Sequence, residues 1–215
     1  MTRELLHSGG ALNARVYRVR GGGGETWIEK DFSGTPWLVR NMVGRFLVLR
    51  ECWALGRLQP ATGIVPGGVR RVSPFCLRED LVDGPDMREH ADAERAKGVA
   101  PGSGKIFPRE FFDRLDAGIR EVHAAGFVHL DLHNARNVMV APDWRPVLVD
   151  WQSALPTFFL PRFLRRALER IDLAGAYKFR EKFRPGELRE NQRRFLRRSM
   201  FLRRHFWVPR VHRNR

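Results

Sequence analysis

The sequence has few cysteines and no long apolar run. Its two thiols are Cys52 and Cys76, whereas an extracellular chain stabilised by disulfides usually carries more, and two cysteines form no metal cluster by themselves. No segment approaches the roughly 18 consecutive apolar residues of a membrane span, and residues 1–16 lack the apolar core of a signal peptide. We therefore expect a soluble, cytoplasmic protein with both cysteines in its core, and peripheral binding at the inner membrane stays open.

Lysine is scarce, and so are acidic residues toward the end of the chain. Only 5 of the 39 basic residues are lysine, and the net charge is +15. Residues 151–215 contain 18 Lys and Arg against 5 Asp and Glu, whereas residues 1–150 contain 21 against 19. The basicity thus belongs to the last third of the chain, either as an anion-binding surface or as the coding bias of a G+C-rich genome.

The first third alternates between apolar and polar residues, as antiparallel strands do. We predict strands at 14–20 and 25–32 around a turn at Gly21–Gly24, and two more strands within 69–82. Residues 36–59 have the period of a helix. Its apolar stripe, which we expect to face the core, consists of Leu38, Met42, Phe46, Leu49 and Trp53.

The remainder of the chain has helical periods after one polar stretch. Residues 84–107 are polar and rich in Gly and Pro, which predicts a mobile loop region after a lobe boundary near residue 82. The two lobes would then be residues 1–82 and 83–215. We expect a helix at 108–125, then a hairpin of two apolar runs that ends at Asp150, and then basic amphipathic helices.

Six polar residues stand among these elements, where burial is costly unless they are paired or used. They are Lys30, Glu51, His129, Asp131, Asn137 and Asp150. Taken singly, each has an ordinary explanation, such as a solvated strand lysine or a core histidine. Taken in order, they supply what phosphoryl transfer from a nucleotide needs: a cation for the phosphates, a partner that orients it, oxygen ligands for magnesium, and a carboxylate beside the acceptor hydroxyl.

The order and spacing of these residues resemble the protein-kinase-like superfamily. Within it, the chain is most similar to compact bacterial kinases related to RIO kinases and to lipopolysaccharide-core (Kdo) kinases. The matching segments are WIEKDF, RECWALGRL, HLDLHNARNVMV, VLVDWQSA and IDLAGAYKFR. The resemblance implies an α+β, two-lobed protein-kinase-like fold, with a small antiparallel-sheet N-lobe and a reduced, mainly helical C-lobe.

The resemblance also implies roles for the catalytic and metal loops. Asp131 would orient the acceptor hydroxyl and take its proton, while Asn137 and Asp150 would hold Mg²⁺. The family's asparagine lies five residues after the aspartate, where this chain has Arg136. We prefer Asn137 because an apolar strand follows it directly, and Asn134 stays open as the alternative ligand.

On the nucleotide side, the resemblance implies that Lys30 contacts the α- and β-phosphates of ATP and that Glu51 holds the lysine. His129 would brace the catalytic loop from behind. Gly9 and Gly10 stand where the loop over the nucleotide is expected, although the sequence has no G-x-G-x-x-G there.

The segment after Asp150 has no A-P-E sequence and no visible platform for a peptide substrate. Its arginine-rich helix can place Phe195, Leu202 and Phe206 on one face, which suits an anionic membrane or glycolipid unless that face packs under the C-lobe. We predict an ATP- and Mg²⁺-dependent kinase whose acceptor is a lipopolysaccharide-core sugar or a protein Ser/Thr. The alternative is an inactive kinase-like scaffold or a nucleic-acid-binding module using the basic tail, although nucleic acid is not the partner we expect.

Overall fold

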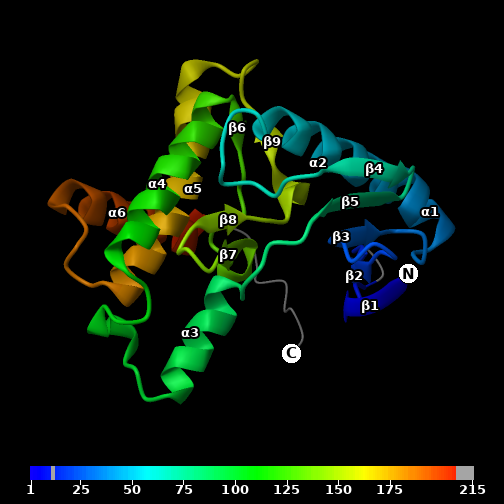
Figure 1. Ribbon diagram of the computed structural model, residues 1–215. Helices are drawn as coiled ribbons and strands as arrows, with labels where there is room; N and C mark the ends of the chain where they lie inside the picture. Colours follow the sequence, from blue (N-terminus) through cyan, green and yellow to red (C-terminus); the bar gives the residue numbers. More distant parts are fainter. Residues whose placement is uncertain (11–12, 207–215) are drawn as a thin grey trace.

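The structure is a computed structural model that describes all residues except 11–12 and 207–215. For residues 202–206 it describes the backbone but not the side chains. It has two parts, an antiparallel sheet followed by a mainly helical region, which confirms the predicted α+β class (Figure 1). The sheet has the strand order β1-β2-β3-β5-β4. Its strands are β1 (Thr2–His7), β2 (Arg15–Arg20), β3 (Thr26–Asp31), β4 (Arg70–Ser73) and β5 (Cys76–Asp80).

The strands predicted at 14–20 and 25–32 are β2 and β3, and they pair antiparallel around the glycine turn as expected. Strand β1 was not predicted. All six of its residues are exposed. A strand is predicted when every second residue is apolar and buried, and β1 lacks that pattern. It forms because its backbone pairs with β2 at the edge of the sheet.

A continuous helical run packs on this sheet and consists of α1 (Trp37–Val39), the π-helical segment η1 (Arg40–Gly44) and α2 (Arg45–Leu58). Glycine is required at Gly44, because a Cβ there would lie 2.9 Å from the Cβ of Phe32. The small core beneath the helix is formed by Ala14, Phe32, Val48 and Leu77.

The predicted orientation of this helix was wrong. The stripe expected to face the core is exposed, at 64% for Leu38, 70% for Met42, 58% for Phe46, 48% for Leu49 and 39% for Trp53. The buried face of α2 instead consists of Val48, Glu51, Ala54, Leu55 and Leu58. The helix is apolar on both sides, so its period could not decide which side meets the sheet.

The second part of the molecule is mainly helical, with short strand pairs between the helices (Figure 1). Its helices are α3 (Met87–Ala96), α4 (Arg109–Ala124), α5 (Arg162–Phe183) and α6 (Glu190–Phe206). Its strands are β6 (Phe127–Val128), β7 (Val138–Val140), β8 (Pro146–Leu148) and β9 (Leu155–Pro156). Single 3₁₀ turns are η2 (Pro101–Ser103), η3 (Ala135–Asn137) and η4 (Trp151–Ser153). The predicted helix at 108–125 and the predicted hairpin, which is β7 paired with β8, are both confirmed.

The mobile loop predicted at 84–107 was wrong, because helix α3 occupies part of it. Asp86 caps the helix by accepting a hydrogen bond from the backbone N–H of Glu89 at 2.8 Å. Met87 and Ala91 are buried and anchor one face, and Phe107 at the end of the segment is fully buried. Only these two residues of α3 are buried, so the polar sequence has no clear helical period of apolar residues.

The basic helix α6 packs against α5 through its first half. Leu196 is buried with Tyr177 and Leu188, and the ring of Phe195 meets the ring of Tyr177 edge-on at 6.1 Å. This part of the predicted amphipathic face therefore lies against the molecule. The side chains of Leu202 and Phe206 lie outside the described residues, so contact of α6 with a membrane stays a prediction. Among the described helices, none is long and apolar enough to span a bilayer.

Two glycines in helices give a matched test of this packing. A Cβ at Gly175 in α5 would lie 2.6 Å from the backbone oxygen of Leu132, whereas one at Gly56 in α2 would meet nothing within 4 Å. We expect Gly175→Ala to lower the free energy of unfolding by about 1–3 kcal/mol, because backbone cannot yield as a side chain does. Gly56→Ala should raise it by about 0.5–1 kcal/mol through helix propensity. Urea unfolding of both variants measures this, and equal effects would show that α5 does not approach the loop so closely.

Candidate active site

A buried ion-pair cluster joins the sheet to helix α2. The Nζ of Lys30 in β3 lies 2.5 Å from Oε1 of Glu51 in α2 and 3.2 Å from Oε1 of Glu79 in β5. All three residues are at least nine-tenths buried. Burial alone would lower the pKa of the Lys30 ammonium, but the carboxylates of Glu51, Glu79 and Asp150 raise it well above its ordinary value. Lys30 is therefore a positively charged side chain that two carboxylates hold in place near the end of β3.

Glu51 is held by more than the lysine. Its Oε1 also accepts a hydrogen bond from the backbone N–H of Trp151 at 3.3 Å, and Trp151 is fully buried with its indole N–H donating to the Leu148 oxygen at 2.8 Å. Burial raises the pKa of Glu51 to about 7, against the opposing effect of the Lys30 charge. This carboxylate thus links the lysine, helix α2 and the segment that follows Asp150.

Glu79 was not among the residues predicted for the site. Lys30 pairs with Leu77 and Ile28 pairs with Glu79 in the register of β3 and β5, so Glu79 is the diagonal neighbour of the lysine on one face of the sheet. The alternation in the β5 sequence places Leu77 and Glu79 on one face, but only the pairing register shows that this is the face of Lys30.

Asp150 lies two residues after the end of β8 in a left-handed backbone conformation, with φ of 65°. The negative charge of its carboxylate helps to raise the pKa of Lys30, so the two side chains attract each other electrostatically. Among the described residues, none forms a hydrogen bond or a close ion pair with the Asp150 carboxylate, in contrast to Glu51. A strained backbone that presents an unpaired carboxylate suits a ligand-binding role.

The loop between β6 and β7 brings Asp131 and both candidate asparagines together. The side-chain N–H group of Asn137 donates to Oδ2 of Asp131 at 2.9 Å and to its backbone oxygen at 3.0 Å. Asn134 in turn donates to Oδ1 of Asn137 at 3.1 Å. Asn137 therefore fixes the Asp131 carboxylate, and its amide oxygen keeps one lone pair for a further partner.

These oxygens fit a magnesium ion that shares its coordination with phosphates. Within the described part of the chain, no group of three or more His, Cys, Asp or Glu side chains has metal-binding geometry. Mg²⁺ is commonly held by one or two carboxylates together with substrate phosphates and water. Asp150 and Asn137 offer one carboxylate and one amide oxygen of this kind, and their role as Mg²⁺ ligands stays a prediction.

His129 is fully buried and lies behind this loop. Its Nε2 is 3.0 Å from the Val149 oxygen, and its ring lies 4.7 Å from the Trp151 ring. Its backbone oxygen accepts a hydrogen bond from Ser153 Oγ at 2.9 Å. The side chain connects the Asp131 loop to the Asp150 loop, and the bracing role of His129 stays a prediction.

Asp172 in α5 is a second buried carboxylate that was not predicted for the site. Its two oxygens accept the backbone N–H groups of His129 at 2.8 Å and Leu130 at 2.7 Å. The ring of His123 in α4 contacts the same carboxylate at 3.0 Å. Leu130 has a φ of 67°, and Asp172 stabilises that left-handed turn immediately before Asp131. In the sequence, the signals were one acid in an otherwise apolar stretch of a basic helix and its place in the matching segment IDLAGAYKFR.

Gly9 and Gly10 lie between β1 and β2, the first hairpin of the sheet. Gly9 has a φ of 68°, and a Cβ there would lie 2.7 Å from the backbone oxygens of Asn13 and Ala14. A glycine is therefore required for the turn itself. Residues 11–12 are outside the described part, and the contact of this turn with a nucleotide stays a prediction.

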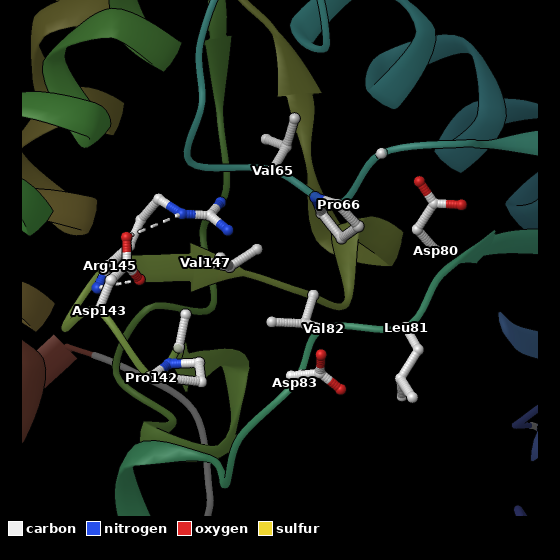
Figure 2. A pocket seen from close by; sticks show the side chains of 12 residues that line it. Val65, Pro66, Asp80, Leu81, Val82, Asp83, Pro142, Asp143, Arg145 and Val147 are labelled. Atoms are coloured by element: carbon white, nitrogen blue, oxygen red, sulfur yellow. Dashed lines mark hydrogen bonds and ion pairs between the residues drawn. The ribbon is translucent and has the colours of Figure 1, made fainter. Parts of the chain in front are cut away.

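A cavity of about 460 Å³ lies beside the connection between the sheet and α3 (Figure 2). Asp80 and Asp83 line one side, and Asp143 and Arg145 from the β7–β8 turn line the other. None of the six candidate residues lines it.

No protein-family model matches the chain, and no curated protein matches its sequence. Its structure is similar to the Rio2 kinase–ADP/Mg²⁺–phosphoaspartate complex from Chaetomium thermophilum, with a TM-score of 0.58 and 15% identity over 86% of this chain. A second Rio2 kinase structure from the same organism has a TM-score of 0.59 and 14% identity, and the alignment covers 93% of this chain and 72% of that one. The chain spans 58% of the length of the first. At this identity the comparison shows the kinase-like fold alone.

Removing the lysine tests the buried cluster. We expect Lys30→Met to lower the free energy of unfolding by roughly 3–5 kcal/mol at pH 8, because Glu51 and Glu79 lose their cation. The pKa of Glu51, about 7 in the folded chain and 4.5 ordinarily, gives the sign of the pH effect. The folded state binds more protons in that window, so this group adds stability as the pH falls. Loss of the lysine raises the pKa of Glu51 further, and the deficit should shrink at pH 5. Lys105→Met, at an exposed position, should change little at either pH.

Asp172→Asn tests the support of the loop. The substitution keeps the size of the side chain but puts an amide N–H group against buried donors, so we expect a loss of roughly 1–3 kcal/mol. Asp92→Asn on the exposed face of α3 is the control and should cost less than about 0.5 kcal/mol. Urea unfolding compares the two, and similar small losses would argue against the role assigned to Asp172.

Proposed function

We propose that the protein is a kinase that transfers the γ-phosphate of ATP to a hydroxyl group with the help of Mg²⁺. The observation that carries this proposal is the buried Lys30. Its ammonium is paired with Glu51 and Glu79, and it also interacts electrostatically with Asp150. A solvated strand lysine would have neither partner. The similar Rio2 kinase structure is a complex with ADP and Mg²⁺, which supports the same assignment.

Lys30 would bind the phosphates of the nucleotide. Its ammonium is placed by two carboxylates before any ligand binds, so little reorganisation is needed when phosphate oxygens approach. The residues that would hold the metal are Asp150 and Asn137, and a bound Mg²⁺ would supply charge neutralisation on the transferring phosphate.

Asp131 would orient the acceptor hydroxyl and accept its proton. Two groups prepare it for this role: Asn137 holds one carboxylate oxygen, and Asp172 fixes the backbone just before it. Phosphoryl transfer has a loose transition state that asks mainly for positioning, so the contribution of Asp131 depends on this rigid support.

For the acceptor we propose a lipopolysaccharide-core sugar or a protein Ser/Thr. The arginine excess of residues 151–215 favours an anionic glycolipid, because phosphate groups pair well with guanidinium groups. The resemblance of the sequence to RIO-like kinases favours a protein hydroxyl. We also propose a cytoplasmic location, where ATP is available.

Replacing the two loop aspartates tests the reaction. With labelled ATP and cell extract as the source of acceptors, we expect Asp131→Asn to lower the rate of transfer roughly 100- to 10,000-fold while ATP still binds. Asp150→Asn should abolish transfer and raise the Mg²⁺ concentration needed for ATP binding. Asp143→Asn, on the exposed β7–β8 turn, is the matched control and should keep full activity.

The products separate the possible acceptors. Label in the lipid fraction identifies a glycolipid, and acid-stable label in protein identifies Ser or Thr. Because the similar complex contains phosphoaspartate, labelled protein should also be treated with hydroxylamine, which releases acyl phosphates. Unchanged transfer in both aspartate variants, or salt-dependent RNA binding without ATP affinity, would instead favour the scaffold or nucleic-acid-binding function.

A further inference from the structure

The outer side of α1, η1 and α2 is an exposed apolar surface. Between residues 36 and 58, every exposed residue is apolar, glycine or arginine. The largest are Trp37, Met42, Phe46 and Trp53, and Trp37 and Met42 are about two-thirds exposed at 68% and 70%. Monomeric proteins rarely leave a contiguous apolar surface of this kind unpartnered.

A second segment extends this surface. Between residues 158 and 171 every exposed residue is again apolar or arginine. The two segments meet where the ring of Trp53 lies 6.2 Å from the ring of Phe158, which in turn lies 5.6 Å from the ring of Phe159. Figure 1 shows α1 and α2 along the upper right of the molecule, with the loop after β9 at the top. We call the exposed residues of 36–58 and 158–171 the arginine-apolar face.

The exposed charged residues of this face are all arginines, so its charge is positive. The only acidic residue between 36 and 58 is Glu51, which is buried against Lys30. The only one between 158 and 171 is Glu169, whose carboxylate is paired with Arg165 at 2.7 Å. Helix α3 offers a contrast, because its exposed face mixes acidic and basic residues, such as Asp92 paired with Arg88 and Arg95. A face that only needed solvation would resemble α3.

From these observations we infer that the arginine-apolar face docks on an anionic membrane surface. Aromatic and aliphatic side chains flanked by arginine, without exposed acids, are the composition of helices that lie in a lipid interface. A second copy of the same face would bring arginines against arginines. The chain's own last segment, residues 207–215, carries three arginines and no acid. Its charge would therefore repel the arginines of this face, so this segment is not the expected occupant either. This surface is different from helix α6, and its binding to lipid does not depend on the proposed phosphotransfer.

Sedimentation with lipid vesicles tests the inference, with the full chain and no ATP. We expect binding at least tenfold stronger to vesicles of 70% phosphatidylcholine and 30% phosphatidylglycerol than to phosphatidylcholine alone, with binding that weakens as salt is added. Lipids with brominated acyl chains should quench the fluorescence of Trp37, and Trp37→Phe should remove a large share of that quenching.

Two charge-reversal variants form a matched pair. Arg45→Glu with Arg57→Glu changes the first residue and the last turn of α2, while Arg88→Glu with Arg95→Glu changes the second residue and the last turn of α3. Both pairs change the net charge by the same amount. We expect the α2 pair to weaken vesicle binding at least tenfold and the α3 pair by less than about twofold. Met42→Ser with Phe46→Ser should reduce both binding and quenching, and urea unfolding checks that each variant is folded.

Several outcomes would overturn the inference. Equal weakening by the two charge-reversal pairs would mean that net charge alone attracts the chain to the vesicles. Binding without quenching of Trp37 would exclude this face as the part that enters the interface. Absence of vesicle binding, together with a dimer that Met42→Ser and Phe46→Ser disperse, would make the face a self-association interface instead.

Discussion

The ion pair between Lys30 and Glu51 is the interaction on which the rest of the structure depends. It joins β3 to α2 across the small core of the first part of the molecule, and Glu51 also accepts the backbone N–H of Trp151 from the second part. One carboxylate therefore sets the position of the lysine, the helix and the segment after Asp150. Burying three charged side chains is costly, and a fold kept only for stability would not need them.

A second buried carboxylate, Asp172, organises the other half of the site. It draws α4, α5 and the loop before Asp131 together by accepting bonds from a histidine ring and two backbone amides. Gly175, one turn along α5, lets the helix backbone approach that loop. Glu51 thus holds the backbone directly after Asp150, and Asp172 holds the backbone directly before Asp131.

Helix α2 has a different task on each side. Its inner face supplies Glu51 to the candidate active site, and its outer face is the centre of the arginine-apolar face. A surface that binds lipid through this helix would also restrain the element that holds the lysine. The proposed membrane contact and the proposed catalytic geometry thus share one helix, although each can be tested without the other.

The sequence by itself determined the α+β class, several of the elements and the residues that could carry phosphoryl transfer. Strands β2 and β3, helix α4 and the β7–β8 hairpin follow from local periodicity, turns and caps, and Lys30, Glu51, Asp131 and Asp150 stand out because polar groups in apolar segments need a reason. Only the tertiary structure decided which face of α2 is buried, that Glu79 joins the lysine, and that Asp172 supports the loop. These depend on strand register and on contacts between segments far apart in the chain, and a helix that is apolar on both sides carries no local signal of which side the sheet will cover.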